Sequence, residues 1–174
     1  MSDFFIRQNL LSSNARTIIK NEAGEPVFLM VGRWGTRGDV LSLYQMNGEI
    51  VASIKQATFA MPIGARFDLY QEFEKVGSLQ RILSIHRDFY YVHQLGWVVI
   101  GDIKNQDYHI YQLNRKVMTL KKKTLTDGEF HHFVVFDDAD APLCICIAAV
   151  LDYWLLNRHK QGLEFKKLFP ELDY

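Results

Sequence analysis

The chain has 174 residues, and its 20 basic residues (Lys and Arg) balance its 20 acidic ones (Asp and Glu), so its formal net charge is zero. This length is typical of a single domain with a sizeable core. The balanced charge excludes a protein whose whole surface attracts nucleic acid, and we expect no nucleic-acid partner. Aromatic residues make up 13% of the chain, mostly Phe and Tyr, which favours strands.

Strands and turns account for most of the sequence before residue 137. Three similar segments predict β-hairpins, because each has a strand ending in Tyr, a short turn and a returning strand. They are residues 44–55, 111–121 and, more loosely, 70–80. Segment 21–26 predicts a weaker fourth turn. Further strands are expected at roughly 4–8, 17–21, 27–32, 65–70, 80–86, 89–95, 97–101 and 130–136, about a dozen in all.

Alternation within the returning strands predicts which side chains face the core. The inward face is apolar and carries Ile50, Ala52, Ile54, Met118 and Leu120. The opposite face, which carries Val117 and Lys121, is expected to meet solvent. The small residues Ala52 and Gly77 would let the backbone approach a central helix closely.

An apolar run near the end of the chain, Leu143–Leu156, predicts a helix at about 139–158 and is interrupted only by Asp152. Because this helix has no polar face, it must be buried all round. The run is shorter than the roughly 20 residues that span a bilayer, so no transmembrane segment is predicted. The acidic residues Asp137, Asp138 and Asp140 and the proline Pro142 mark its start. The predicted fold class is mainly β with a buried helix (α+β).

The cysteines favour a reduced, cytoplasmic protein. Cys144 and Cys146 lie two residues apart in the predicted helix, so they point to nearly opposite sides and cannot pair with each other. The N-terminus, residues 1–7, has no basic-then-apolar signal pattern.

No linker divides the chain, so residues 1–160 are expected to form one domain, with 161–174 as a short amphipathic tail packed on it. The tail carries apolar residues from Leu163 to Leu172. Packing on the protein's own surface is the favoured interpretation, and a contact surface for a protein partner is the alternative.

Diffuse strand motifs carry a family resemblance: Gly38–Tyr44, Asn47-Gly48, Ala52–Gln56, Phe67–Tyr70, Val76-Gly77, Gly101-Asp102, Tyr108–Tyr111, Lys121-Lys122 and Leu151-Asp152. With these motifs the chain resembles the bacterial branch of the LURP-one-related (YxjI-like) family up to about Lys160. That family is similar to the C-terminal domain of Tubby proteins and to phospholipid scramblases. The resemblance implies a Tubby-like barrel of about twelve antiparallel strands around a central hydrophobic C-terminal helix. Tubby domains bind phosphoinositide headgroups through surface Lys and Arg, an analogy here at the level of fold alone.

Two basic segments are candidate sites for anions or phospholipids. The densest contains Arg115, Lys116, Lys121, Lys122 and Lys123. It would attract anionic headgroups, although alternation sends Lys122 to the opposite face from Lys121 and Lys123. A solvated hairpin whose lysines discourage edge pairing is the favoured alternative. The second segment is the Gly-rich loop from Gly32 to Asp39, with Arg33 and Arg37. It lacks the phosphate-binding loop pattern, so a plain strand connection is favoured.

Asp152 is predicted to be a structural buried acid that hydrogen-bonds to strand backbone or to an Arg, because an unpartnered buried carboxylate is costly. A chemically active acid is the alternative. The adjacent His131 and His132 face opposite sides of a strand and cannot share a metal. For the cluster at residues 137–140, helix capping is favoured over Ca²⁺ binding. No catalytic residue, metal site or cofactor is predicted.

The sequence therefore favours a non-enzymatic cytoplasmic binding module for an anionic phospholipid or another small anionic ligand. Two alternatives remain open at this point. One is a protein–protein interaction module that acts through the tail, and the other is an enzyme with a site at a barrel mouth that no motif reveals.

Overall fold

The described strands of the protein form a closed β-barrel around a central helix. The computed structural model describes residues 1–7, 14–33, 38–57, 66–82, 89–126 and 128–152. The strands are β1 (Ser2–Arg7), β2 (Asn14–Asn21), β3 (Pro26–Arg33), β4 (Val40–Gln45), β5 (Ile50–Gln56), β6 (Arg66–Gln71), β7 (Glu74–Ile82), β8 (Phe89–His93), β9 (Trp97–Asp102), β10 (Asp107–Gln112), β11 (Arg115–Leu125) and β12 (Gly128–Val135). Neighbours in the chain pair antiparallel, and β1 closes the ring by pairing with both β2 and β12. The predicted barrel and fold class are confirmed.

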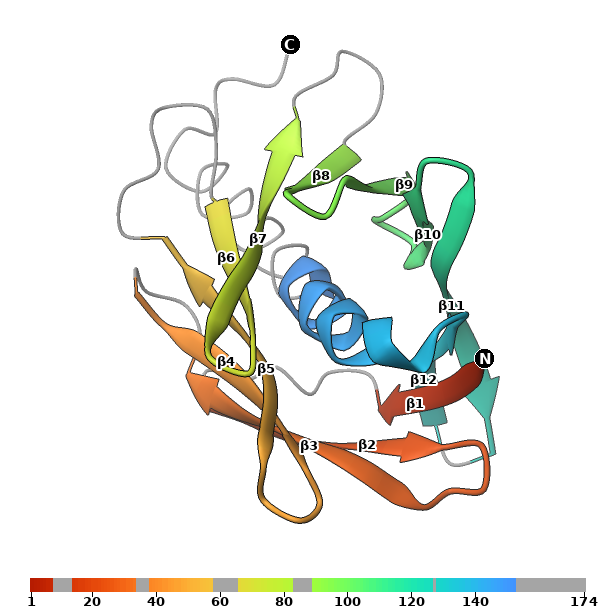
Figure 1. Cartoon of the computed structure of the whole chain (residues 1–174). Helices are drawn as coiled ribbons and strands as arrows, with labels where there is room; N and C mark the ends of the chain where they lie inside the picture. Colours follow the sequence, from red (N-terminus) through yellow and green to blue (C-terminus); the bar gives the residue numbers. More distant parts are fainter. Residues whose placement is uncertain (8–13, 34–37, 58–65, 83–88, 127, 153–174) are drawn as a thin grey trace, which may run out of the picture.

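The central helix covers residues 141–152 of the described chain and runs through the barrel, where it is blue in Figure 1. A short 3₁₀ helix, η1 (Asp138–Asp140), leads into it. The Asp137 side chain caps this start by accepting a hydrogen bond from the backbone N–H of Ala139, at 3.1 Å. Residues 141–151 are all buried. A helix without a polar face is thus enclosed as predicted, beginning two residues after the predicted start.

The helix and the inward side chains of the strands share one hydrophobic core. Its largest fully buried members come from strands all around the ring: Trp97, Tyr108, Phe67 and Phe133. Because strand side chains alternate, Leu41 and Leu43 of β4 belong to this core while Ser42 between them does not. The barrel is therefore filled by its own helix.

Four hairpins of the barrel share one irregularity, a β-bulge that places an extra residue in the returning strand. In β4–β5, for example, Leu43 pairs with Ala52 and Tyr44 pairs with Ile50, which leaves Val51 without an opposite residue. The extra residue is a valine every time: Val27, Val51, Val76 and Val117. All four are in the core or pack against it.

Two predictions from simple alternation are corrected by these contacts. Val117 is 0% exposed, not on the solvent face, because the bulge turns it and the next residue, Met118, to the same side. Gly77 was expected to let the backbone approach the central helix closely. The backbone close to it is instead that of strand β8. A Cβ added to Gly77 would lie 2.8 Å from the carbonyl oxygen of His93.

Candidate functional site

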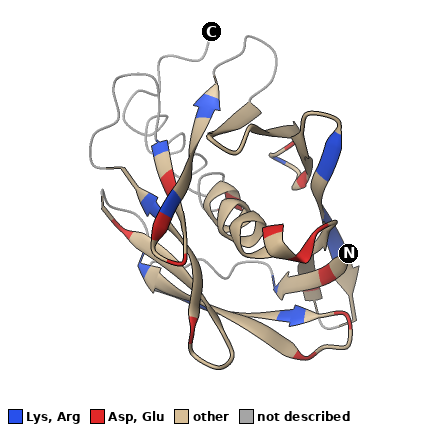
Figure 2. Ribbon diagram, viewed as in Figure 1, with Lys and Arg blue, Asp and Glu red and all other residues tan. Residues whose placement is uncertain are grey.

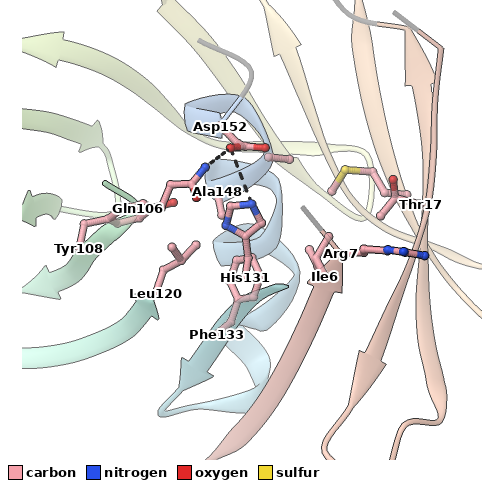
Figure 3. A pocket seen from close by; sticks show the side chains of 12 residues that line it. Ile6, Arg7, Thr17, Gln106, Tyr108, Leu120, His131, Phe133, Ala148 and Asp152 are labelled. Atoms are coloured by element: carbon pink, nitrogen blue, oxygen red, sulfur yellow. Dashed lines mark hydrogen bonds and ion pairs between the residues drawn. The ribbon is translucent and has the colours of Figure 1, made fainter. Parts of the chain in front are cut away.

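A small cavity lies beside the last described turn of the central helix, between the helix and the barrel wall (Figure 3). Its volume is about 30 Å³, which is enough for a water molecule. Apolar side chains such as Leu120, Phe133 and Ala148 form part of the wall. The polar side chains around it are Arg7, Thr17, Gln106, His131 and Asp152.

Asp152 is the acid of this cavity, and its side chain is 15% exposed. Its Oδ1 accepts a hydrogen bond from Nε2 of Gln106, at 2.5 Å. Gln106 lies in the turn between β9 and β10 and has a φ of 58°, a left-handed conformation that is uncommon for a residue with a side chain. Burial raises the pKa of Asp152, while His131 and the Gln106 hydrogen bond act in the opposite direction.

His131 approaches the same carboxylate from β12, as Figure 3 shows. Its Nε2 is 3.7 Å from Oδ1 of Asp152, which is too long for a hydrogen bond. The side chain is buried, and Nε2 has no hydrogen-bond partner among the described residues. Burial lowers the pKa of His131, although the Asp152 charge raises it. Burial thus disfavours the charged form of both side chains around this cavity.

The sequence led us to expect a buried acid at Asp152 bonded to strand backbone or to Arg. The structure gives it two side-chain contacts, Gln106 and His131, and its role as an anchor stays a prediction. Neither contact residue was predicted. Alternation separated His131 from His132, but it did not tell which of them faces inward. No sequence motif predicts that Gln106 contacts Asp152. The two residues are 46 positions apart, and they meet only because the folded barrel brings the β9–β10 turn next to the helix.

The predicted basic hairpin does not form one patch. At the start of β11, Nη2 of Arg115 is 3.0 Å from Asp140, beside the beginning of the helix. The ammonium of Lys116 lies 5.7 Å from the centre of the Tyr111 ring. Lys121 follows five residues later, about 16 Å along the strand. In Figure 2 the basic residues lie on several strands around the barrel.

The end of β11 divides its three lysines between the two faces, as alternation predicted. Lys122 is directly opposite the inward His131, and its Nζ is 2.8 Å from Glu129. Lys121 and Lys123 are exposed on the outside. The ammonium of Lys123 lies 5.6 Å from the centre of the Phe5 ring, a cation–π distance.

Barrel closure brings further residues beside these two lysines. Lys20 pairs with Phe5, Phe5 with His132, and His132 with Lys121, which forms one row across β2, β1, β12 and β11. We call Phe5, Lys20, Lys121, Lys123 and His132 the basic outer face. The rings of Phe5 and His132 stack with centroids 4.7 Å apart. Lys20 and Phe5 were not predicted, because their distance from β11 in sequence hides the contact.

The other residues that the sequence singled out lie neither at the cavity beside the helix nor on the basic outer face, as far as the structure describes them. Arg33 is exposed at the end of β3, and Arg37 lies outside the described residues, as does the tail at 161–174. Asp140 is paired with Arg115 and Asp137 caps the helix start, as the capping prediction required. In the described part of the chain no group of three His, Cys, Asp or Glu side chains is placed to hold a metal ion.

The two cysteines, Cys144 and Cys146, are two residues apart on the central helix and are free, buried thiols. Burial raises the pKa of Cys146 to about 12, and it also raises the pKa of Cys144 well above its ordinary value. Thiols in this state are poor nucleophiles. None of the described helices has the length and apolar character needed to cross a bilayer.

Comparison with known proteins gives three consistent similarities. The chain is 23% identical over 163 residues to the uncharacterized protein YxjI of Bacillus subtilis (strain 168), covering 94% of this chain and 99% of that protein. The fold is similar to that of an Arabidopsis thaliana protein solved by X-ray crystallography, with a TM-score of 0.59 and 14% identity over 87% of this chain and 89% of the other. The sequence profile of the LURP-one-related family matches residues 2–152. The chain therefore belongs to the LURP-one-related family.

Proposed function

We propose that this protein is a non-catalytic binding module whose basic outer face takes anionic groups, with phospholipid headgroups as the favoured ligand. One observation supports this most directly. Barrel closure places Lys20 and Lys121 in one row at either side of Phe5 and His132, with Lys123 over the Phe5 ring. Three strand spacings separate Lys20 from Lys121, about 14 Å, which matches a surface of several headgroups better than one small anion.

The electrostatics of this face are local, because the whole chain carries no net charge. Lys20, Lys121 and Lys123 are all exposed. The nearby acidic side chain, Asp3, is engaged by His132, with Nε2 at 2.6 Å from Oδ1. Among the described residues no ion pair engages the ammonium groups of Lys20, Lys121 and Lys123, and each contributes about 1 kcal/mol near an anionic membrane.

A cytoplasmic location completes the proposal. Cys144 and Cys146 are free thiols, as expected of a protein kept in a reducing compartment. The similarity to a Bacillus subtilis protein supports a bacterial origin. Fractionation of cells would then find the protein in the cytoplasm or at the inner side of the membrane.

The test is co-sedimentation of the whole chain with vesicles of phosphatidylcholine alone or mixed with phosphatidylglycerol, at low and high salt. Binding is expected only to the anionic vesicles and is expected to weaken at high salt. Lys121→Gln should lower the partition coefficient about fivefold. The matched control is Lys55→Gln, an exposed lysine on β5, six strands from β11 in either direction around the ring.

Calorimetric titration with glycerol phosphate at constant ionic strength separates a headgroup in a membrane from a free anion. One outcome is a heat of binding to glycerol phosphate that Lys121→Gln abolishes, together with no binding to vesicles. That outcome would support an anion site on the basic outer face but would reject the membrane as its ligand. Absence of binding in both assays, or an equal loss in the two variants, would reject the basic outer face.

A further inference from the structure

A groove lies on the outside of the barrel over β8, β9 and β10, which neighbour one another in the ring (Figure 1). Its volume is about 630 Å³, and none of the described residues that line it carries a charge. Most of the lining is apolar or aromatic: Tyr91, Leu95, Val98, Ile100, Tyr111 and Leu113.

The strand register explains why this surface is hollow. Tyr91 pairs with Val98, and Val98 pairs with Tyr111, so one row of outward side chains has a valine between two tyrosines. The tyrosines are two strand spacings apart, which is about 10 Å. Ile100 lies two residues further along β9 on the same outward face. The smaller valine thus forms the floor between two larger aromatic side chains.

A hydrogen-bonded amide fixes the end of the groove nearest the β8–β9 and β10–β11 turns. Nε2 of Gln112 on β10 donates a hydrogen bond to the carbonyl oxygen of Leu95 in the β8–β9 turn, at 3.0 Å. Oε1 of the same amide accepts a hydrogen bond from Nη2 of Arg115, at 2.9 Å. Because these contacts join two neighbouring hairpins, the groove is already formed without a ligand, which lowers the cost of binding.

Leu113, at the tip of the β10–β11 hairpin, is an unusual residue for its position. It is 92% exposed, and its φ is 52°, a left-handed conformation that is rare for a bulky residue. Glycine would adopt this conformation without strain. Ile100, in the same groove, is 47% exposed. Two large apolar side chains thus face water here, one of them on a strained backbone, as is typical of an interaction surface.

The charge at the edge of the groove indicates which partner fits. Lys116 is opposite Tyr111 in the same row, and its ammonium lies 5.7 Å from the centre of that ring. Among the described residues no carboxylate forms an ion pair with this ammonium, whereas the neighbouring Arg115 is paired with Asp140 at 3.0 Å. The groove therefore combines an apolar floor with an unpaired positive charge.

We propose that this groove docks an extended segment of a partner protein in which apolar side chains alternate with Asp or Glu. The apolar side chains lie over Val98 and against Ile100 and Leu113, and a carboxylate of the segment lies beside Lys116. Charge complementarity therefore selects an acidic segment over a basic one. A helix, 10–12 Å across with its side chains, is too wide for the space between the two tyrosines.

Two other kinds of ligand fit this surface less well. Sites for small molecules bury most of the ligand, whereas Leu113 and Ile100 leave this groove open to solvent. The membrane is proposed to bind at the basic outer face, and β9 lies three strands from β12 around the ring. The groove is thus a separate surface, which stays accessible to a protein when the basic outer face is occupied.

The test is fluorescence anisotropy of short labelled peptides added to the whole chain. Leu and Glu alternate in the first peptide, Lys replaces Glu in the second, and Ser replaces Leu in the third. The first should bind most tightly, and high salt should weaken its binding. Leu113→Gly should weaken it about tenfold. Lys116→Glu should reverse the preference, so that the second peptide binds more tightly than the first.

Two matched controls distinguish the groove from general properties of the chain. Phe73→Ser removes an exposed apolar side chain from the β6–β7 turn, and Lys55→Glu makes the same charge change on β5. Both variants should bind the first peptide as the wild type does. The melting temperature of Leu113→Gly should stay close to the wild-type value, because relief of strain at positive φ offsets the greater freedom of glycine in the unfolded chain.

The proposal is overturned if the first peptide binds no better than the other two, or if either control loses as much affinity as Leu113→Gly. An unchanged preference in Lys116→Glu would reject the acidic partner. A lower melting temperature of Leu113→Gly with unchanged peptide binding would make Leu113 a structural residue. Vesicle co-sedimentation of Leu113→Gly should match the wild type, and a loss there without any peptide binding would assign the groove to the membrane instead.

Discussion

Replacement of Val117 by Ala tests the bulged hairpins most directly, because alternation and the structure predict opposite results. Alternation places Val117 on the solvent face, where loss of two methyl groups has little effect. In the structure Val117 is 0% exposed and belongs to the core. The two methyl groups contribute about 1.6 kcal/mol of burial. With the cavity that they leave, the expected loss of unfolding free energy is about 2–3 kcal/mol.

Urea unfolding followed by tryptophan fluorescence measures this loss, because Trp97 is buried in the same core. The melting temperature should fall by about 4–12 °C for a chain of this size. Val134→Ala is the matched control, since Val134 is half-buried on the adjacent β12 and faces outward opposite Thr119. That control should cost less than about 1 kcal/mol. Equal losses in the two variants would refute the assignment of Val117 to the core.

Two further predictions concern the cavity and the turn beside it. Asp152→Asn should raise the melting temperature at pH 7.5, because burial raises the pKa of the carboxyl and disfavours its charged form. The gain should shrink as the pH falls toward 3.8, where the wild-type side chain becomes neutral as well, and a lower melting temperature at pH 7.5 would contradict this. Gly101→Ala should destabilise the protein by more than Gly48→Ala in urea unfolding. Both glycines have positive φ, but only at Gly101 would the added Cβ meet backbone, at 2.6 Å from the carbonyl oxygen of Asp107. Equal losses would mean that backbone strain alone accounts for the effect.

Most of the fold could be predicted from the sequence, because hairpins and helices are encoded by patterns of neighbouring residues. The repeated Tyr-turn segments are observed as β4–β5, β6–β7 and β10–β11, and the apolar run near residue 143 is observed as the central helix. What alternation missed is the single extra residue in each bulge. A bulge changes the facing of a side chain by one position, and nothing in the spacing of Val117 distinguishes it from a regular strand residue.

The candidate sites were less accessible, because they depend on contacts between distant segments. Basic residues close together in sequence were grouped, yet Arg115 pairs with Asp140 at the start of the helix while Lys121 lies on the basic outer face. The residues that complete that face, Lys20 and Phe5, enter only through the closure of β1 onto β12. Likewise, Asp152 stood out as a charge in an apolar run, but its contact Gln106 lies in a turn without any distinguishing motif.

The position of the central helix after the twelve strands of the barrel also determines when the described part of the molecule can fold. During synthesis all twelve strands leave the ribosome before residues 141–152. Strand β1 cannot close the barrel until its partner β12 has been synthesised. Until the helix arrives, the inward faces of the strands have nothing to pack against. Long-range pairing of this kind makes folding slow and leaves apolar surface exposed meanwhile. A nascent chain that stalls before residue 141 would therefore be a substrate for chaperones or proteases, however well its individual hairpins form.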